Sequence, residues 1–213
     1  MKSVFYIFFS VLLISLLYAV VRYNLFGDVP WEHIPLYILN KVFAISGFVI
    51  LMISSWISAS KNINSSWRLV LFERRDILGF GSLVLIIIHV FISLAILKPE
   101  YFEKFFDTND KLNVVGELSM LFGILGLAMM WMVNRYFSLG DMAIQQSKIR
   151  HHFKILINLA IIAGFLHTLI MGIKSWLKPI EWYGYLPPIT LLAAIGFLIW
   201  LFTVPLKKTL KAH

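Results

Sequence analysis

The sequence predicts an all-α, polytopic membrane protein with six transmembrane helices and both termini in the cytoplasm. Of its 213 residues, 60% are hydrophobic and only 14% are charged, which leaves too few polar groups to cover a soluble globule. Several apolar runs approach the roughly 20 residues that an α-helix needs to cross a bilayer. The Lys and Arg residues behind the net charge of +8 fall in short clusters between these runs, as juxtamembrane charges do, so no nucleic-acid partner is expected.

The candidate spans follow one another with short connections, so residues 1–213 are predicted to form a single transmembrane domain. They cover about residues 4–21, 36–58, 77–97, 112–134, 153–173 and 185–206. The first begins after Lys2 as a signal peptide would, but its exit, YAVVRYNLF, has no small-x-small cleavage pattern, so an uncleaved helix is expected. The second to fifth are apolar runs of helix length. The sixth carries Pro187 and Pro188 near its start, whereas the other prolines cluster at span ends.

The charges of the loops predict the orientation. With six spans, the termini share one side of the membrane with the second and fourth loops. That side carries Lys2, Lys61, Arg68, Arg74, Arg75, Arg135, Lys148, Arg150, Lys207, Lys208 and Lys211. The opposite side carries most of the acids, including Asp28, Glu32, Glu100, Glu103, Asp107, Asp110 and Glu181. The positive-inside rule therefore places both termini in the cytoplasm, as in a multi-pass protein of the cell membrane.

Two histidines lie deep inside predicted spans, His89 in the third and His167 in the fifth. An ionisable residue at membrane depth is costly and marks a functional-site hypothesis by default. Both spans run from inside to outside, and at about 1.5 Å per residue His89 lies roughly 21 Å beyond Arg75 and His167 roughly 25 Å beyond Arg150. The imidazoles are thus within one helical turn in depth. Because imidazole is a common axial ligand of haem iron, both are predicted to ligate one haem b if their helices face each other.

Cysteine is absent from the sequence, and this limits the chemistry that a redox site can use. Disulfides, thiolate metal sites, cysteine-held iron–sulfur clusters and covalent c-type haem attachment are all excluded. The short connections also leave no room for a flavin-binding or nicotinamide-binding domain. A haem in this chain would therefore receive its electrons from a separate flavoprotein or from the quinol pool, with FMN or a quinone as the donor.

A second pair of histidines, His151 and His152, lies at the cytoplasmic mouth of the fifth span. Both are too shallow to share an iron with His89. Around the helix, His152 lies roughly 60° from His167 and His151 about 160° from it, so His152 is the better cofactor ligand of the two. One haem is expected rather than two, because Arg75 and its neighbour stand where the third span would need a histidine. A second haem held by His152 or His151 with an unconventional partner stays open.

Two segments carry a resemblance to a known family. RRDILGFGSLVLIIIH, from Arg74 to His89, opens with an Arg-Arg and Leu-Gly pattern and ends in the deep histidine. The segment from Asn134 to His167 has an Asn-Arg pair closing the fourth span, a short basic loop, a histidine at the start of the fifth span and another deep within it. These patterns resemble the ferric reductase-like transmembrane family, particularly its small bacterial branch that supplies electrons to a periplasmic methionine sulfoxide reductase.

The resemblance implies a b-type haem between helices, electrons that enter from a cytoplasmic flavin or quinol, and reduction of an acceptor on the outer side. His89 and His167 match the deep ligands of the family, and His151 or His152 matches its shallow histidine.

Arg75 and Arg150, at the cytoplasmic starts of the third and fifth spans, allow two interpretations. In the first, they set the orientation of the chain and contact lipid headgroups. In the second, they bind haem propionates or the phosphate of a reduced flavin, because a guanidinium group matches such anions in bidentate fashion. The second interpretation makes both arginines candidate cofactor-binding residues.

Two classes of function remain from the sequence. The first is a cytochrome b-like, iron-binding electron carrier that acts as a metalloreductase or as the electron-transfer subunit of an oxidoreductase, with a periplasmic or extracellular reductase as partner. The second is a cofactor-free transporter, scaffold or assembly factor in which the histidines transfer protons or metal ions. In both classes the chain is surrounded by the lipid bilayer.

Overall fold

The computed structural model describes residues 2–59, 75–137 and 147–204, and within these ranges the backbone is overwhelmingly helical. Six helical segments are long and apolar enough to cross a membrane, so the predicted all-α, six-span architecture is confirmed. They run over Ser3–Leu25, Trp31–Ser58, Arg75–Ala95, Val114–Arg135, His152–Trp176 and Tyr183–Thr203. In the described ranges, β pairing is limited to one isolated bridge between Phe106 and Leu112. The chain is thus a multi-pass helical membrane protein.

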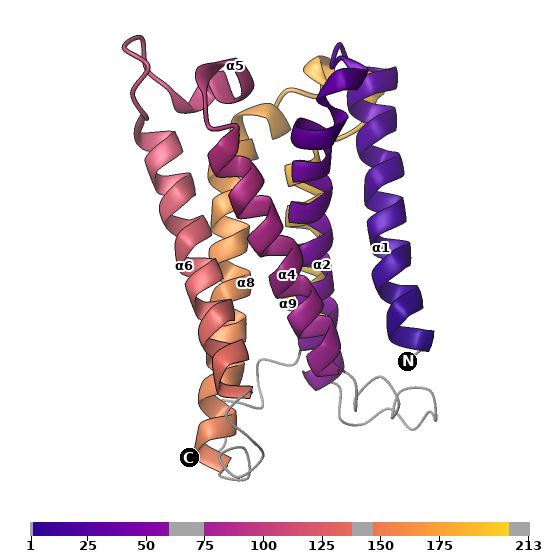
Figure 1. Cartoon of the computed structure of the whole chain (residues 1–213), viewed down its shortest axis with the longest axis vertical. Helices are drawn as coiled ribbons and strands as arrows, with labels where there is room; N and C mark the ends of the chain where they lie inside the picture. Colours follow the sequence, from indigo (N-terminus) through magenta and orange to yellow (C-terminus); the bar gives the residue numbers. More distant parts are fainter. Residues whose placement is uncertain (1, 60–74, 138–146, 205–213) are drawn as a thin grey trace.

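The long helices stand side by side and alternate in direction (Figure 1). Their bounds are α1 (Lys2–Val20), α2 (Leu39–Ala59), α4 (Arg75–Ala95), α6 (Val114–Phe137), α8 (Ser147–Trp176) and α9 (Ile189–Thr203). The short helix α5 (Pro99–Phe102) lies between α4 and α6, at the top of Figure 1. We call this the α5 end of the bundle; the start of α1 lies at the opposite end.

Some helix boundaries differ from the prediction for identifiable reasons. The sixth span was predicted from residue 185, but α9 begins at Ile189, and Pro188 is its N-cap in an extended conformation. Two successive prolines lack the N–H groups that a helix interior needs, so regular helix starts only after them. The fifth helix starts at Ser147, six residues before the apolar run, because helix continues into the polar segment that precedes the span. Two π-helical turns, Val21–Leu25 and Ile34–Ile38, extend the first two spans and have no signature in the apolar pattern.

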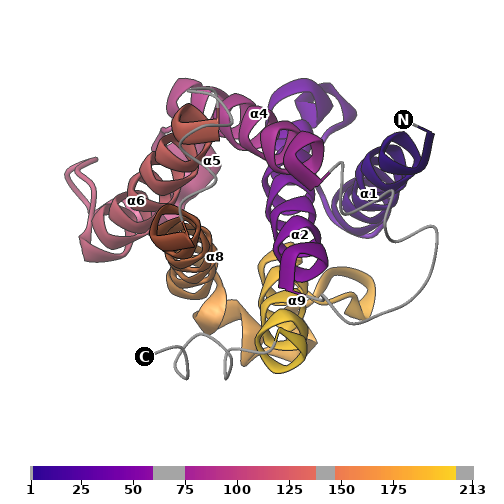
Figure 2. The same cartoon turned by 90° about the horizontal axis from the view of Figure 1, so that it is seen from below.

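The bundle contains two closely packed helix pairs, α2 with α4 and α6 with α8 (Figure 2). In the first pair, the Ser82 hydroxyl of α4 donates to the Gly47 carbonyl of α2 at 2.7 Å. In the second pair, a Cβ placed on Gly126 of α6 would lie 3.6 Å from the Cβ of Ala163 on α8, so the two helices are in van der Waals contact. Small and hydroxylated residues at such interfaces let helix backbones approach closely within a membrane.

Helix α2 forms the centre of the fold, and α9 joins it to the second pair. Of the most apolar stretch of the second span, 56% is buried within the structure, compared with 17–33% for the other spans. The indole N–H of Trp200 on α9 donates to the Ser55 hydroxyl of α2 at 3.2 Å. One turn before Trp200, Phe197 of α9 stacks on Phe165 of α8 with 4.1 Å between ring centroids. These contacts fix the α2–α4 pair relative to the α6–α8 pair.

Candidate cofactor site

The structure brings the two deep histidines together across the gap between the helix pairs. His89 comes from α4 and His167 from α8, two helices that belong to different pairs. Their ring centroids lie 6.4 Å apart and their planes are inclined by 74°. The two imidazoles therefore lie close together at a similar depth in the bundle, in agreement with the helix-rise argument from the sequence.

The ring of His89 is oriented by a polar cluster between α2 and α4. Its Nδ1 lies 2.7 Å from the side-chain oxygen of Asn40 and 3.2 Å from the Asn40 carbonyl. The Ser93 hydroxyl lies 3.3 Å from the same nitrogen, and the Asn40 amide N–H donates to this hydroxyl at 3.0 Å. Both Asn40 oxygens are acceptors, so the Nδ1 of His89 carries the proton and donates. Asn40 is almost completely buried, which makes this bond a fixed part of the interior.

The ring of His167 is oriented from α6. Its Nδ1 lies 2.7 Å from the Ser119 backbone carbonyl and 3.1 Å from the Ser119 hydroxyl. Because a carbonyl oxygen can only accept, Nδ1 donates here as well. One turn further along α6, a Cβ on Gly123 would lie only 3.2 Å from this Nδ1. Glycine at position 123 thus gives the imidazole room to reach the Ser119 carbonyl.

Both imidazoles are held in the state that suits a metal ligand. With the proton on Nδ1, each Nε2 keeps a free lone pair, and no hydrogen bond reaches either Nε2 from the described part of the chain. Metal-binding histidines nearly always donate their other ring N–H to a carbonyl, carboxylate or water, which fixes the tautomer and raises the basicity of the ligating nitrogen. Asn40 and Ser119 occupy the positions of such supporting groups.

The distance between the rings also fits a metal ion between them. An imidazole nitrogen binds a metal at about 2.0–2.1 Å and lies roughly 1.1 Å from its own ring centroid, so two imidazoles on opposite sides of one ion have centroids roughly 6.3 Å apart. The observed separation is 6.4 Å. The residues present therefore fit two axial ligands of one iron.

The number of ligands favours a porphyrin over a bare metal ion. Among the described residues, no group of three or more His, Cys, Asp or Glu side chains could hold a metal ion. Two imidazoles alone leave a bare ion short of the three or four protein ligands that zinc sites use. A haem supplies four nitrogen ligands of its own and needs only the two axial positions from the protein.

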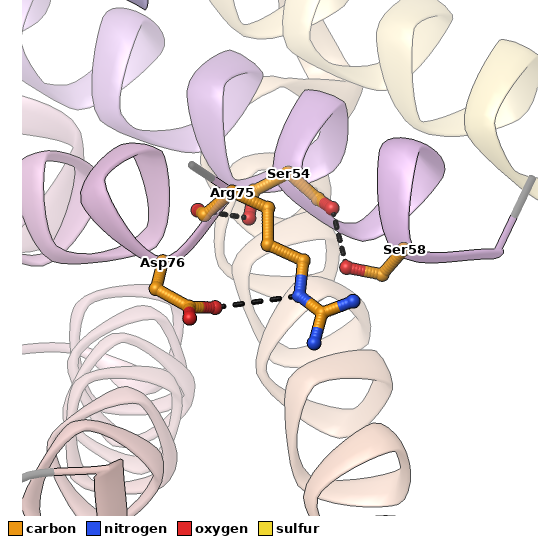
Figure 3. Close-up of polar contacts among 4 residues, drawn as sticks. All are labelled: Ser54, Ser58, Arg75 and Asp76. Atoms are coloured by element: carbon orange, nitrogen blue, oxygen red, sulfur yellow. Dashed lines mark hydrogen bonds and ion pairs between the residues drawn. The ribbon is translucent and has the colours of Figure 1, made fainter. Parts of the chain in front are cut away.

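The structure does not bring the predicted cytoplasmic residues to this site. His152 is exposed at the far end of α8, fifteen residues and thus roughly 22 Å of helix away from His167. Arg75 is fourteen residues before His89 on α4, at the same far end, where its Nε lies 3.3 Å from an Asp76 carboxylate oxygen (Figure 3). The side chains of Arg150 and His151 lie outside the described residues.

The contacts of Arg75 join the end of α2 to the start of α4. The Ser54 hydroxyl of α2 donates to the Arg75 carbonyl at 3.1 Å, and Ser58 donates to the Ser54 carbonyl at 2.9 Å (Figure 3). Together with Asp76, these groups fix the backbone where α4 begins. Figure 3 thus shows Arg75 in contact with Asp76 and Ser54, and its predicted role in cofactor binding stays a prediction.

The sequence reasoning did not identify the supporting residues of the site. Asn40 and Ser119 lie within predicted spans, and an asparagine near the start of an apolar run was one visible signal. Their roles depend on which helices are neighbours, which a single sequence does not reveal. Lys41, next to Asn40, was a further signal. A lysine inside a predicted span costs free energy, so it usually has a partner or a function inside the bundle.

Comparison with known proteins gives no assignment for this chain. No protein-family model matches it, and no curated protein matches it significantly. The chemistry of the two imidazoles and their surroundings is therefore the basis for assigning a function.

Proposed function

We propose that the chain is a b-type haem protein that carries electrons across the membrane, with His89 and His167 as the axial ligands of one haem. The observation that carries this proposal is the pair of imidazoles, 6.4 Å apart, each with its Nδ1 engaged by a neighbouring helix. The resemblance of the third and fifth spans to the ferric reductase-like family supports the same proposal.

Each group of the site has a separate task in this mechanism. A bound haem supplies one-electron chemistry at its iron. His89 and His167 would hold the haem iron from two helices, an arrangement that would suit electron transfer. Asn40 and Ser119 hold the two rings in one tautomer and one orientation, so little reorganisation accompanies the change of charge. The apolar spans exclude water from the site.

The loop charges support an orientation of the chain, and the resemblance to the ferric reductase-like family implies a direction of electron flow. We propose that both termini face the cytoplasm, so that the α5 end lies on the outer side of the cell membrane. Electrons would enter at the opposite end from a separate flavoprotein carrying FMN or from a quinol, and leave at the α5 end to a periplasmic or extracellular reductase. In this arrangement Arg75, Arg150, His152 and His151 lie on the donor side. There they are candidates for binding the donor or a second haem.

The first test is optical. The full chain, purified in detergent after expression with haem supplied, should give the reduced-minus-oxidised spectrum of a six-coordinate b-type haem and about one haem per chain in a pyridine haemochrome assay. A value near two would add a second haem held by His152 or His151. A chain that takes up no haem would contradict the proposal and leave the cofactor-free transporter, scaffold or assembly factor.

A further inference from the structure

Two lysines flank the histidine pair on the side of the α5 end. The first, Lys41, follows Asn40 in α2 and is half-buried within the second span. Its ammonium group lies 3.8 Å from the ring centroid of Tyr37 and 5.3 Å from that of Tyr23. Aromatic faces in such positions attract a cation, so the two tyrosine rings favour the charged form of Lys41.

The second lysine, Lys104, reaches the site from the loop between α5 and α6. Although much of its side chain is exposed, its ammonium group donates to the Met171 carbonyl of α8 at 2.6 Å. Met171 lies four residues beyond His167, which is about 6 Å or one helical turn nearer the α5 end. Loss of water around this ammonium group, followed by the charge of Lys41, lowers the pKa of Lys104 to about 8. The two lysines are therefore close enough to repel each other.

Each lysine is also connected to one histidine of the site through a neighbouring residue. Lys41 follows Asn40, whose side-chain oxygen lies 2.7 Å from the Nδ1 of His89, and Lys104 donates to the carbonyl of Met171, four residues beyond His167. An aromatic pair lies between the segments that carry the two lysines. The Tyr37 ring, which contacts the Lys41 ammonium group, lies 6.2 Å from the ring of Tyr101, three residues before Lys104. Two cations thus lie together on one side of the two imidazoles.

Neither lysine has a carboxylate within ion-pair distance among the described residues. Two like charges held together near an apolar interior destabilise each other and lose hydration, and an anion bound between them reverses both effects. The arrangement is therefore typical of a binding site for an anion with two charged groups. A third cation, the buried guanidinium of Arg22, lies 5.2 Å from the centroid of the same Tyr23 ring but donates to the backbone carbonyls of Tyr183 and Leu186. Arg75 lies roughly 21 Å along α4 from His89 and cannot serve the same ligand.

We propose that Lys41 and Lys104 bind the two propionate carboxylates of the haem that His89 and His167 hold. The inference rests on the proposed function, since it concerns the same haem. Each ammonium group acts as a point charge with rotatable donors, which suits carboxylates at the end of flexible propionate chains. The lysines therefore fix which edge of the porphyrin faces the α5 end, in addition to neutralising its charge.

The test compares two porphyrins on the full chain. Apoprotein in detergent is titrated with haemin and with haemin dimethyl ester, whose carboxylates are blocked, and binding is followed through the six-coordinate optical spectrum. The native chain should bind haemin at least about tenfold more tightly than the ester, since a charge-assisted hydrogen bond is worth about 1.5 kcal/mol or more. In a Lys41→Met, Lys104→Met double variant this preference should disappear, whereas Lys111→Met, in the same loop, should keep it.

The outcomes separate the two proposals. Equal binding of both porphyrins by the native chain, with the six-coordinate spectrum intact, would overturn the lysine assignment and leave the haem assignment standing. A full preference for haemin in a folded double variant would overturn it too. If neither porphyrin gives a six-coordinate spectrum with the native chain, the proposed function fails and this inference fails with it. The native-chain comparison needs no substitution, so it stays decisive even if the double variant does not fold.

Discussion

The two helix pairs, α2–α4 and α6–α8, each present one histidine to the site but orient it by different means. In both, the second helix of the pair carries the histidine and the first helix accepts its Nδ1 hydrogen bond. The shorter contact of His89, 2.7 Å, is with the side-chain oxygen of Asn40, and the Asn40 backbone carbonyl lies 3.2 Å away; the shorter contact of His167, 2.7 Å, is with the backbone carbonyl of Ser119. The orientation of His167 therefore depends mainly on the backbone, and that of His89 depends more on one replaceable side chain.

The interfaces within the two pairs show the same difference between side-chain and backbone contacts. In the first pair, Ser82 of α4 donates to the Gly47 carbonyl of α2, and Ser54 of α2 donates to the Arg75 carbonyl of α4. In the second pair, the close contact comes from small residues, with Gly126 of α6 facing Ala163 of α8. Side-chain hydrogen bonds thus position the first pair, and backbone proximity positions the second.

Removal of either ligand should have the largest effect and should affect the two pairs equally. We expect His89→Ala and His167→Ala each to abolish the six-coordinate spectrum and to lower haem content about tenfold or more, since even supporting residues of metal sites contribute that much. Haem content and the low-spin signal in electron paramagnetic resonance provide the measurement. His33→Ala is the matched control, because that imidazole packs against Tyr101 in the loop region instead. A single variant that kept the full six-coordinate spectrum would remove that histidine from the ligand set.

Removal of the groups that accept the histidine hydrogen bonds should affect the two helix pairs differently. Asn40→Leu removes the side-chain acceptor of His89, and we expect haem affinity to fall about 10–100-fold. Ser119→Ala removes only a hydroxyl and keeps the carbonyl that holds His167, so its haem affinity should change by less than about threefold. Titration of both apoproteins with haemin measures the difference. Equal losses in the two variants would mean that the proposed difference between the pairs is wrong.

Haem affinity should vary with pH because of Lys104, the lysine that contacts α8 in the second pair. Lys104 has a pKa of about 8 without ligand, and the groups that face it are the Lys41 ammonium, the Met171 carbonyl and His167. A carboxylate favours the charged lysine, so binding takes up a proton above pH 8 and haem affinity should fall as pH rises through 8 to 10. We expect a loss of up to about tenfold, measured by haemin titration.

The Lys104→Met variant is the control for this pH dependence. Its haem affinity should be lower at pH 7 than that of the native chain but flat between pH 8 and 10. A slope that persists unchanged in this variant would assign the titration to another group.

Two glycine substitutions should produce smaller and contrasting effects. A Cβ on Gly123 would lie 3.2 Å from the Nδ1 of His167, so Gly123→Ala should disturb the spectrum and reduction potential of the haem more than the melting temperature. A Cβ on Gly47 would lie 2.9 Å from the Ile86 side chain, so Gly47→Ala should destabilise the α2–α4 interface by about 1–3 kcal/mol and leave the spectrum unchanged. Thermal unfolding and optical spectra of both variants check the contrast. The reverse pattern would place Gly47, and not Gly123, at the site.

The sequence predicts what depends on composition and on position along one helix. Apolar runs locate the six spans, and helical rise places His89 and His167 at one depth. It cannot reveal which helices are neighbours, because that depends on side-chain packing between distant segments. The pairing of His89 with Asn40 and of Lys104 with Met171 is therefore visible only in the structure. The π-helical turns were missed for a related reason, since an extra residue in a turn leaves apolar composition unchanged.

The central position of α2 has a consequence for the assembly of the protein in the membrane. The buried polar side chains of α2 find their partners at different points along the chain. Asn40 is bonded by His89 and Ser93 of α4, whereas the Ser55 hydroxyl accepts from Trp200 of α9, which follows much later in the sequence. A chain interrupted before α9 would thus leave the buried Ser55 hydroxyl without its indole partner in apolar surroundings.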